Sequence, residues 1–252
     1  MLFKILLIMK CKLSLLMFAA VLATGCSIYH PQAVDIPLID HKGDVRVDVS
    51  AAMSAMVVPD VVTMNTTVSY GFTDWLAGQA HINYGGDNYY AQVAPGAYYP
   101  LGEHGLLEGY VGVGYGGAWS DNTDKQDDNP KYDYKGSFAV PFGQVNIGWR
   151  NLTAAHIDLA MGLKAGSYLP SFNYREYNAD GSLKPEGAYS YNTANVLLEP
   201  QFIFRIGSQH VKFCLRGSFA WLSDMYSDNP NAGADKFVSD IVTLSAGINF
   251  TF

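Results

Sequence analysis

Charged residues are scarce in this sequence of 252 residues: only 15% are Asp, Glu, Lys or Arg, whereas soluble domains carry about 25%. Long apolar runs are also missing, because beyond residue 25 none approaches the roughly 18 residues that a membrane-spanning helix needs. Aromatic residues make up 13% of the chain, and their abundance, with that of β-branched residues, argues against a disordered chain. Gly (25) and Tyr (17) are also plentiful. This combination indicates a β-barrel that crosses a membrane.

The first 25 residues have the pattern of an export signal, which we treat as a separate segment, 1–25. Three lysines precede an apolar core from Leu13 to Ala23, which has signal length and is too short to span a bilayer. The core ends in Leu-Ala-Thr-Gly-Cys, which resembles a bacterial lipobox, although Ala23 stands where Leu is usual. The resemblance implies that Cys26 is diacylated and becomes the new N-terminus. An ordinary signal-peptidase site with an incidental cysteine is the alternative.

The charge of the mature chain excludes one class of function. Residues 1–25 hold three of the 16 Lys and Arg and no acid, so 13 basic and 23 acidic residues remain, a net charge of −10. A chain this acidic does not bind nucleic acid electrostatically. The mature cysteines are Cys26 and Cys214. With Cys26 acylated, we expect no intrachain disulfide.

Two further segments follow the signal. Residues 26–43 show no hydrophobic period, and we interpret them as an extended periplasmic linker whose apolar residues Val34, Ile36, Leu38 and Ile39 could pack against another surface. Residues 44–252 alternate with a period of two almost without a break, which is typical of β-strands. They divide into ten segments of about the length that a tilted membrane strand needs. We therefore predict an all-β fold, a closed antiparallel transmembrane barrel of about ten strands.

Charge is confined to one face of these predicted strands. A soluble β-sandwich also alternates, but its outward face is polar, whereas here one face of every strand carries no charge at all. Cations and anions on the other face would point into a narrow lumen, where unpaired charges are costly. We expect cross-strand ion pairs among them, with Arg46, Arg205 and Arg216 as partners of the acids. The inward cations are Arg46, Arg150, Lys164, Arg205, Lys212 and Arg216, and the inward anions are Asp48, Glu108, Asp158 and Glu199.

The connections between the predicted strands alternate in length. The long ones include residues 120–135, 169–192 and 223–239, whereas every second connection has only two to five residues. Outer-membrane barrels have long outer loops and short periplasmic turns. The short set, and with it both termini, should therefore face the periplasm. Pro95, Pro141 and Pro200 lie inside predicted strands, where each removes a ladder N–H, so we expect bulges or a locally opened ladder there.

Several features resemble known bacterial barrels. The C-terminal strand VTLSAGINFTF ends in Phe252 and resembles the β-signal read by the barrel-assembly machinery. Residues 44–252 are similar to small OmpA-like and OmpW-like barrels. The lipobox, the lead-in over residues 35–44 and the Gly-Phe-Thr-Asp-Trp turn resemble lipobox-bearing barrels of Bacteroidetes. Ser27, which is not Asp, follows the cysteine and by enterobacterial sorting implies the outer membrane. The resemblance implies a lipid anchor at the periplasmic leaflet.

Catalytic candidates are few and weak. His156 and Asp158 share one face, as the Asp and His of ten-stranded omptin proteases do, but they fall at the periplasmic start of a strand rather than at the outer rim. His81 lies nearer the outer rim without an acidic neighbour in sequence. Lipid esterases and phospholipases built on barrels need polar residues on the lipid face, and this face has none that fit. We therefore expect no enzyme, no catalytic residue and no cofactor.

Three other features invite a binding function. Asp121, Asp124, Asp127, Asp128 and Asp133 give residues 120–135 carboxylates that suit Ca²⁺, but the EF-hand order is absent, so we expect a solvated loop rather than a metal site. The segment 169–192 combines Tyr174, Tyr177, Tyr189 and Tyr191 with Arg175, Glu176 and Asp180, a set that could bind sugars or proteins. Cys214 lies between two inward cations that could lower its pKa, although a small lumen-filling residue explains it equally.

The sequence therefore favours a lipid-anchored outer-membrane barrel with a structural, surface-exposed or accessory role. A narrow channel for small solutes is the alternative, and an enzyme acting on lipid or protein is the third. Expected partners are outer-membrane lipids and lipopolysaccharide, the assembly machinery and an unidentified membrane protein, with no nucleic acid. Because function concentrates on loops held by a rigid scaffold, we expect ligand contacts on the long outer loops, 169–192 first.

Overall fold

The computed structural model describes residues 27–29, 36–54, 62–85, 87–121, 131–178, 180–223, 238–239 and 242–252. Cys26 and residues 122–130 lie outside them. Ten long antiparallel strands form the main sheet. Their bounds are β2 (Val45–Ser54), β3 (Val62–Gly71), β4 (Leu76–Gly85), β5 (Asn88–Leu101), β6 (Gly105–Asp121), β7 (Lys131–Trp149), β8 (Asp158–Tyr177), β10 (Asn195–Gly207), β11 (Val211–Phe219) and β14 (Val242–Thr251).

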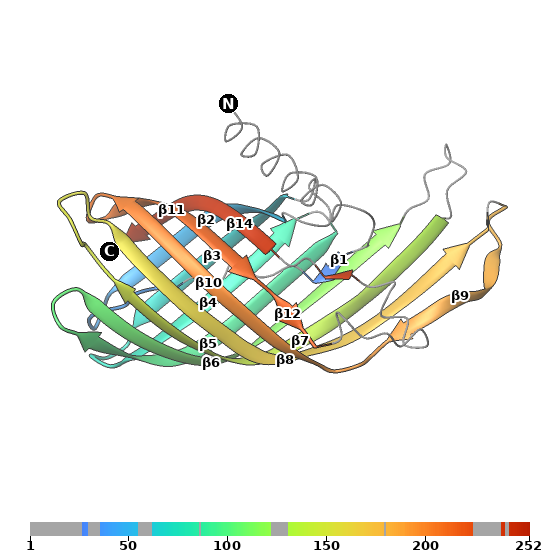
Figure 1. The fold of residues 1–252 in the computed structure, drawn as a ribbon, viewed down its shortest axis with the longest axis horizontal. Helices are drawn as coiled ribbons and strands as arrows, with labels where there is room; N and C mark the ends of the chain where they lie inside the picture. Colours follow the sequence, from blue (N-terminus) through green and yellow to red (C-terminus); the bar gives the residue numbers. More distant parts are fainter. Residues whose placement is uncertain are drawn as a thin grey trace, which may run out of the picture.

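The sheet closes on itself. Its strands follow the order β10–β11–β14–β2–β3–β4–β5–β6–β7–β8, and β8 pairs with β10 over eleven residue pairs, from Tyr168–Asn195 to Asp158–Arg205. Figure 1 shows the resulting tilted barrel. Closure leaves none of these ten strands with an open edge, which a lipid environment requires. The prediction of a ten-stranded antiparallel barrel is confirmed.

Four short strands lie outside the ring of ten. β9 (Leu183–Tyr191) pairs with the far end of β8, and β12 (Trp221–Leu222) continues β11 along β10. β1 (Ser27–Tyr29) pairs in parallel with β13 (Val238–Ser239). Among the described residues, no helix is long and apolar enough to cross a bilayer.

The two ends of the barrel differ. At the short-turn end, β3 and β4 are joined by residues 72–75, β5 and β6 by 102–104, and β10 and β11 by 208–210. Val45 and Phe252, the two ends of the barrel sequence, exchange main-chain hydrogen bonds of 3.3 and 3.0 Å at this end. At the opposite, long-loop end, β7, β8 and β9 project well beyond the other strands (Figure 1).

One predicted loop is largely strand, and the ends of a second belong to strands. Residues 169–192 were expected to form a single loop, but β8 continues to Tyr177 and pairs with β9, which begins at Leu183, so the two strands form a β-hairpin. Likewise β6 and β7 extend to Asp121 and Lys131. The alternation of apolar and polar residues stops before the strands end. It shows where one face of a strand contacts an apolar environment, and backbone pairing continues beyond that point.

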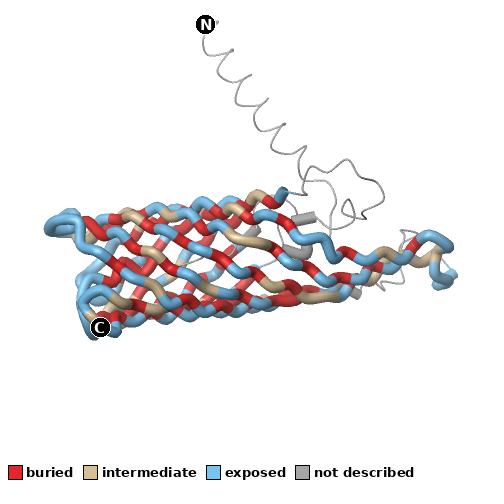
Figure 2. The backbone as a smooth tube through the Cα atoms, turned by 90° about the horizontal axis from the view of Figure 1, so that it is seen from below, coloured by how far each residue is buried: buried red, intermediate tan, exposed pale blue. Residues whose placement is uncertain are grey.

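The barrel wall has the opposite polarity to the surface of a soluble protein, because its outward side chains are apolar and its inward ones are largely polar. Burial alternates residue by residue along every strand, as Figure 2 shows, with polar and charged side chains buried in the lumen and large apolar ones exposed. Val111 (71% exposed), Tyr99 (66%) and Trp75 (61%) illustrate the outer face. This is the construction of a membrane-spanning β-barrel.

The three prolines open the ladder without shifting its register. Between β5 and β6, Val93 pairs with Val113 and Gly96 with Tyr110, and the two positions between them, which include Pro95, have no partner in β6. The same gap occurs at Pro141 towards β8 and at Pro200 towards β11. Each proline keeps its pairing on the other side. The expected local opening is confirmed.

Candidate functional site

The lumen is the first candidate site, and the segment before β2 fills its short-turn end. Ile36, Leu38, Ile39 and Asp44 are completely buried. The sequence predicts an extended linker over residues 26–43, but the described part from Ile36 onward packs inside the barrel instead. We call residues 36–44 the lumen plug. In an extended linker its apolar side chains would be exposed to water. Packing against the barrel wall buries them, which is energetically favourable.

Main-chain hydrogen bonds hold the lumen plug. The N–H of Ile39 donates to Oε1 of Glu108 over 3.0 Å, and Nη2 of Arg205 donates to the carbonyl of Ile36 over 2.8 Å. Leu38 has φ of 58°, a left-handed conformation that is rare for a bulky residue. Such strain costs about 1–3 kcal/mol and persists only where the surroundings impose it. The contacts with the barrel therefore stabilise this backbone conformation of Leu38.

Glycines on the wall make room for the lumen plug. A Cβ on Gly148 would stand 2.6 Å from Cδ2 of Leu38, and one on Gly71 would stand 2.4 Å from the carbonyl oxygen of His41. The N–H of Gly43 (φ 85°) donates to the carbonyl of Gly71 over 2.8 Å. Larger side chains at these wall positions would displace the plug.

Ion pairs line the lumen around and beyond the plug. Arg216 pairs with Asp48 and donates to Oγ of Ser50 over 2.9 Å, which confirms one predicted cross-strand pair. Two further pairs use lysines, whereas the expected partners of the acids were arginines. Lys164 pairs with Glu199 at 3.1 Å, and Lys212 with Asp158 at 2.5 Å. The alternation put the correct residues in the lumen, but it could not choose partners across tilted strands.

Lys164 and Glu199 form the most enclosed of these pairs, since both side chains have no exposed surface. Lys164 also donates to the hydroxyl of Tyr90 and to Oε1 of Gln92, each over 3.4 Å, and its Nζ lies 4.6 Å from the centroid of the Phe142 ring. A buried cation is tolerated only with such partners. This group fills the middle of the lumen on the β5, β7, β8 and β10 side.

A second charged group closes the short-turn end. Asp44 accepts from the guanidiniums of Arg46 (3.3 Å) and Arg150 (3.5 Å), and Arg150 also contacts Asp40. Burial raises the pKa of Asp40, but the charge of Arg150 and hydrogen bonds from His41 and Arg150 outweigh it and lower the pKa to about 2. Asp40, His41 and Asp44 come within metal-ligand reach of one another. Two guanidiniums already neutralise the carboxylates, so ion pairing explains this cluster.

The catalytic candidates do not assemble into a site. His156 lies in the turn before β8 with φ of 48°, and Asp158 is committed to Lys212 and to the main-chain N–H of Asn151. His81 shares a 2.9 Å hydrogen bond with the hydroxyl of Thr67. These contacts are those of a lumenal hydrogen-bond network. Cys214 is also fully buried, and the cations on either side of it, Lys212 and Arg216, are engaged with Asp158 and Asp48.

The predicted tyrosines lie on the long hairpin rather than in a loop. Tyr174 and Tyr191 are buried on its inner face, and Tyr174 stacks on Tyr132 with ring centroids 5.8 Å apart. The ring centroids of Tyr189 and Tyr174 are 6.0 Å apart, and the hydroxyl of Tyr177 donates to Oδ2 of Asp133. Asp133 lies in β7, while Asp124, Asp127 and Asp128 lie outside the described residues. The inner aromatic face continues into the barrel through Phe172 and Phe138.

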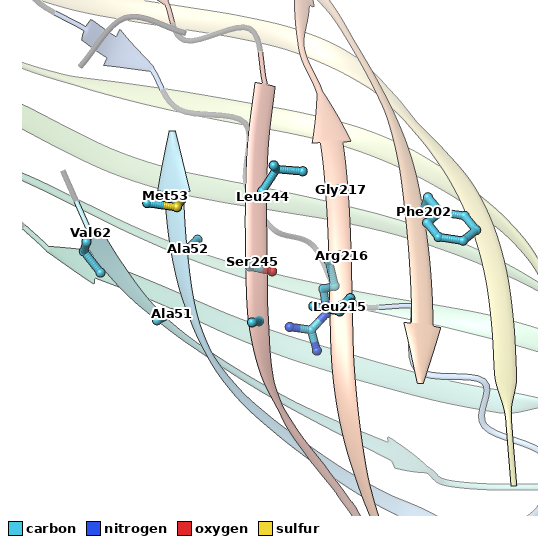
Figure 3. A pocket seen from close by; sticks show the side chains of 11 residues that line it. Ala51, Ala52, Met53, Val62, Phe202, Leu215, Arg216, Gly217, Leu244 and Ser245 are labelled. Carbon is cyan, nitrogen blue, oxygen red and sulfur yellow. The ribbon is translucent and has the colours of Figure 1, made fainter. Parts of the chain in front are cut away.

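Two hollows lie on the described outer wall. One, of about 660 Å³, lies where small residues on adjacent strands (Ala51, Gly217 and Ala246) are flanked by Met53, Val62, Phe202, Leu215 and Leu244 (Figure 3). Its lining is mostly apolar and also includes Arg216 and Ser245. The other, of about 740 Å³, lies near the long-loop end and is lined by Tyr89, Trp119, Asp133, Tyr134, Lys135, Asn173 and Arg175.

Sequence reasoning missed the lumen plug and the group at Asp40 and Asp44. The available signal was the apolar set Ile36, Leu38 and Ile39 in an otherwise polar lead-in. Its contacts are with residues 69 and 169 positions away, which no local pattern identifies.

Comparisons with known proteins leave the family of this chain open. No family model and no curated protein matches the sequence. The solved structures that align over most of the chain include a bacterial polysaccharide outer membrane secretin (11% identity, 85% of this chain and 99% of that chain, TM-score 0.22), OmpT of Vibrio cholerae (9%, 86% and 100%, 0.21) and Salmonella typhi OmpF in complex with daunomycin (8%, 83% and 97%, 0.21). At these TM-scores the likenesses carry no argument, so the fold assignment rests on the strand pairing itself.

Proposed function

We propose that this chain is an outer-membrane β-barrel, lipid-anchored through Cys26, with a closed lumen and a structural, surface-exposed or accessory role. It performs no catalysis. The apolar outer wall supports a membrane location, and the difference between short turns and long hairpins supports an outer membrane with the long-loop end outside. The observation that carries the proposal is the lumen plug, because a barrel filled by its own chain and by buried ion pairs is a scaffold rather than an open pore.

Planar-bilayer recording tests the closed lumen. The wild-type barrel should give no steady conductance, whereas a variant with Ile36, Leu38 and Ile39 all changed to Ser should show openings, because the plug loses its apolar burial. A matched control is Val111→Ser on the outer face, which should stay silent. A sizeable steady conductance from the wild type would replace the scaffold with a channel.

The lipid anchor has its own test. Mass spectrometry of the mature protein should find an acylated N-terminal Cys26, and Cys26→Ala should still give an assembled barrel, since the wall alone spans the bilayer. An unmodified Cys26, or cleavage elsewhere, would reject this part of the proposal.

Lipopolysaccharide is the partner that the outer wall fits best. Lys135 and Arg175 line the hollow near the long-loop end together with Trp119 and Tyr89. Aromatic rings at the membrane boundary beside cations suit an anionic headgroup at the outer leaflet. Replacing both cations with Gln should weaken co-purification of lipopolysaccharide without loss of the folded barrel.

A narrow channel remains the second candidate because one side of the lumen is polar. Gln79, Gln201, Thr243, Ser245 and Asn249 are buried there, and each has a side-chain polar atom without a partner among the described residues. Buried polar groups of this kind are normally hydrated. A hydrated track along this side would carry water or small solutes past the plug, and the bilayer recordings above would detect its ion conductance.

A further inference from the structure

Two cations near the long-loop end differ from the other described cations of the barrel. From Arg46 to Arg216, the other lysines and arginines whose side chains the structure describes all contact an acid or a main-chain carbonyl: Arg46, Arg150, Lys164, Lys184, Arg205, Lys212 and Arg216. Lys135 and Arg175 make no ion pair or side-chain hydrogen bond with a described residue. Both line the hollow of about 740 Å³ on the outer wall. Their charges are therefore available to a ligand in that hollow.

The outer wall changes from apolar to polar at the level of this hollow. Three successive rows of register partners across β6, β7 and β8 show the change: Tyr115–Ala139–Leu169, Gly117–Ser137–Ser171 and Trp119–Lys135–Asn173. The ring centroids of Tyr89 and Trp119, which both line the hollow, are 6.4 Å apart. Aromatic side chains gather where a barrel leaves the hydrocarbon of the membrane. The hollow therefore lies at the level of the lipid headgroups.

Lys135 and Arg175 lie on neighbouring strands at positions from which they can reach one anion. Lys135 in β7 pairs with Asn173 in β8, and Arg175 is two residues further along β8. Such diagonal neighbours are about 7–8 Å apart, which long side chains can bridge. Oδ1 of Asn173 accepts from Oγ of Ser190 over 2.9 Å, so the amide NH₂ of Asn173 remains to donate. An ammonium, a guanidinium and an amide together suit a phosphate group.

Asp133 adds an acceptor to these donors. It is the register partner of Arg175 and lines the same hollow. Its Oδ2 accepts from the hydroxyl of Tyr177 over 3.1 Å, and a carboxylate has further lone pairs that can accept from a ligand. The carboxylate repels a bare phosphate, whereas it binds the hydroxyl of a sugar. Asp133 therefore favours a phosphate that is attached to a sugar.

We propose that this hollow binds a single phosphate group on the sugar headgroup of an outer-leaflet glycolipid. Lys135 and Arg175 share the phosphate, Asn173 donates to it, and Asp133 accepts from a neighbouring sugar hydroxyl. This inference rests on the proposed function, which supplies lipopolysaccharide as a partner and places the long-loop end outside. It adds the chemical group that is recognised and the residue that selects it. The bound headgroup connects β7 and β8 where both strands leave the membrane.

Binding of defined lipids to the whole mature chain, refolded in detergent, tests the proposal. The probes are lipid A with two phosphates, with one and with none, and phosphatidic acid, which has a phosphate but no headgroup hydroxyl. Native mass spectrometry of the lipid-bound barrel gives the dissociation constants. We expect the two phosphorylated forms of lipid A to bind with similar affinity. The form without phosphate should bind at least about tenfold more weakly, because it loses the charge-assisted contacts.

Three variants assign the roles, and heat-modifiable migration shows that each is folded. Lys135→Gln and Arg175→Gln should each weaken binding of lipid A with one phosphate by about tenfold or more. Asp133→Asn should reduce the preference for this lipid over phosphatidic acid. The control is Lys42→Gln, which removes an exposed cation at the short-turn end and should leave the affinities unchanged.

The outcomes separate this inference from the proposed function. If lipid A needs both phosphates, or if Lys135→Gln and Arg175→Gln bind it like the wild type, the shared phosphate is wrong although lipopolysaccharide remains a partner. An unchanged preference in Asp133→Asn overturns the selection by that residue. A wild-type chain that binds no form of lipid A rejects lipopolysaccharide as the partner, and this inference with it.

Discussion

The main-chain N–H of Ile39 donates a 3.0 Å hydrogen bond to Oε1 of Glu108, a residue 69 positions later on the barrel wall. The same carboxylate accepts from the hydroxyl of Tyr110 at 3.2 Å and from the amide of Asn146 at 3.2 Å. Glu108 is thus the point at which the segment before the barrel is fixed to the barrel. Three donors around one buried carboxylate replace the water that burial removes.

We predict that Glu108→Ala loosens the lumen plug. Three buried donors lose their acceptor, so the free energy of unfolding in lipid vesicles, measured by urea titration, should fall by about 1–3 kcal/mol. Amide exchange at Ile39 should accelerate. Glu103→Ala, in the exposed turn before β6, is the control and should change neither quantity. Equal effects of the two variants would contradict the assigned role.

For the buried Lys164–Glu199 pair, we predict that removing one charge destabilises the barrel much more than replacing both charges. Lys164→Met leaves Glu199 without its partner and should cost about 3–5 kcal/mol, whereas the double variant Lys164→Met/Glu199→Leu should recover most of that loss. The more exposed pair of Lys184 and Glu176 on the long hairpin is the control, where Lys184→Met should cost less than about 1 kcal/mol. A double variant as unstable as the single one would show that the pair contributes more than it costs to bury.

The short-turn end should loosen in acid. Asp40 has a folded-state pKa of about 2 against an ordinary value of 3.8, so the folded state binds fewer protons than the unfolded state in this range. Its contribution is complete above about pH 4 and is lost as the pH falls towards 2. Cleavage of the lumen plug by pepsin should therefore rise between pH 4 and pH 2. In Asp40→Asn that rise should be smaller, and identical profiles for the two proteins would reject the Asp40–Arg150 contact as its cause.

How much of this molecule the sequence predicts depends on how local the information is. Val45, Val47 and Val49 alternate with Arg46 and Asp48 because each strand separates lipid from lumen, so the ten strands and their inward charges could be predicted. The hairpin of β8 and β9 could not, because residues such as Asn173 and Arg175 are polar on the outward face once the strand leaves the membrane. Backbone pairing continues there without a hydrophobic signal.

The candidate site, too, could be predicted only where local sequence carries the information. That Lys164 and Glu199 face inward follows from a period of two, but that they meet depends on the tilt and stagger of β8 and β10. The lumen plug depends on Ile36 and Arg205 meeting across the closed barrel. Only the closed fold brings those residues together.

Substitutions at two wall glycines should distinguish two effects of a Gly→Ala change: loss of the space that the lumen plug occupies, and the ordinary change in strand stability. A Cβ on Gly148 would stand 2.6 Å from both Leu38 and Ala160, whereas one on Gly109 meets nothing within 4 Å. Gly148→Ala should therefore destabilise the barrel by about 1–3 kcal/mol. Gly109→Ala should be neutral or slightly stabilising, with both measured by urea titration in vesicles. Equal losses would mean that Gly148 is not needed to accommodate the plug.

The long hairpin is where a surface partner or ligand should bind, because it presents most of the described structure beyond the barrel. Its last inner-facing register pair near the barrel is Phe172–Tyr191, so residues 173–190 can be replaced by Asn-Gly, which favours a two-residue hairpin turn. The closing pairs of β8 and β10 start at Tyr168 and remain intact, so the barrel should keep its heat-modifiable migration. Proteins and lipids that co-purify with the wild type from its native membrane should be reduced with the truncated form. If the same partners are retained in full, binding lies on the outer wall or the N-terminal segment, and the hairpin has no recognition role.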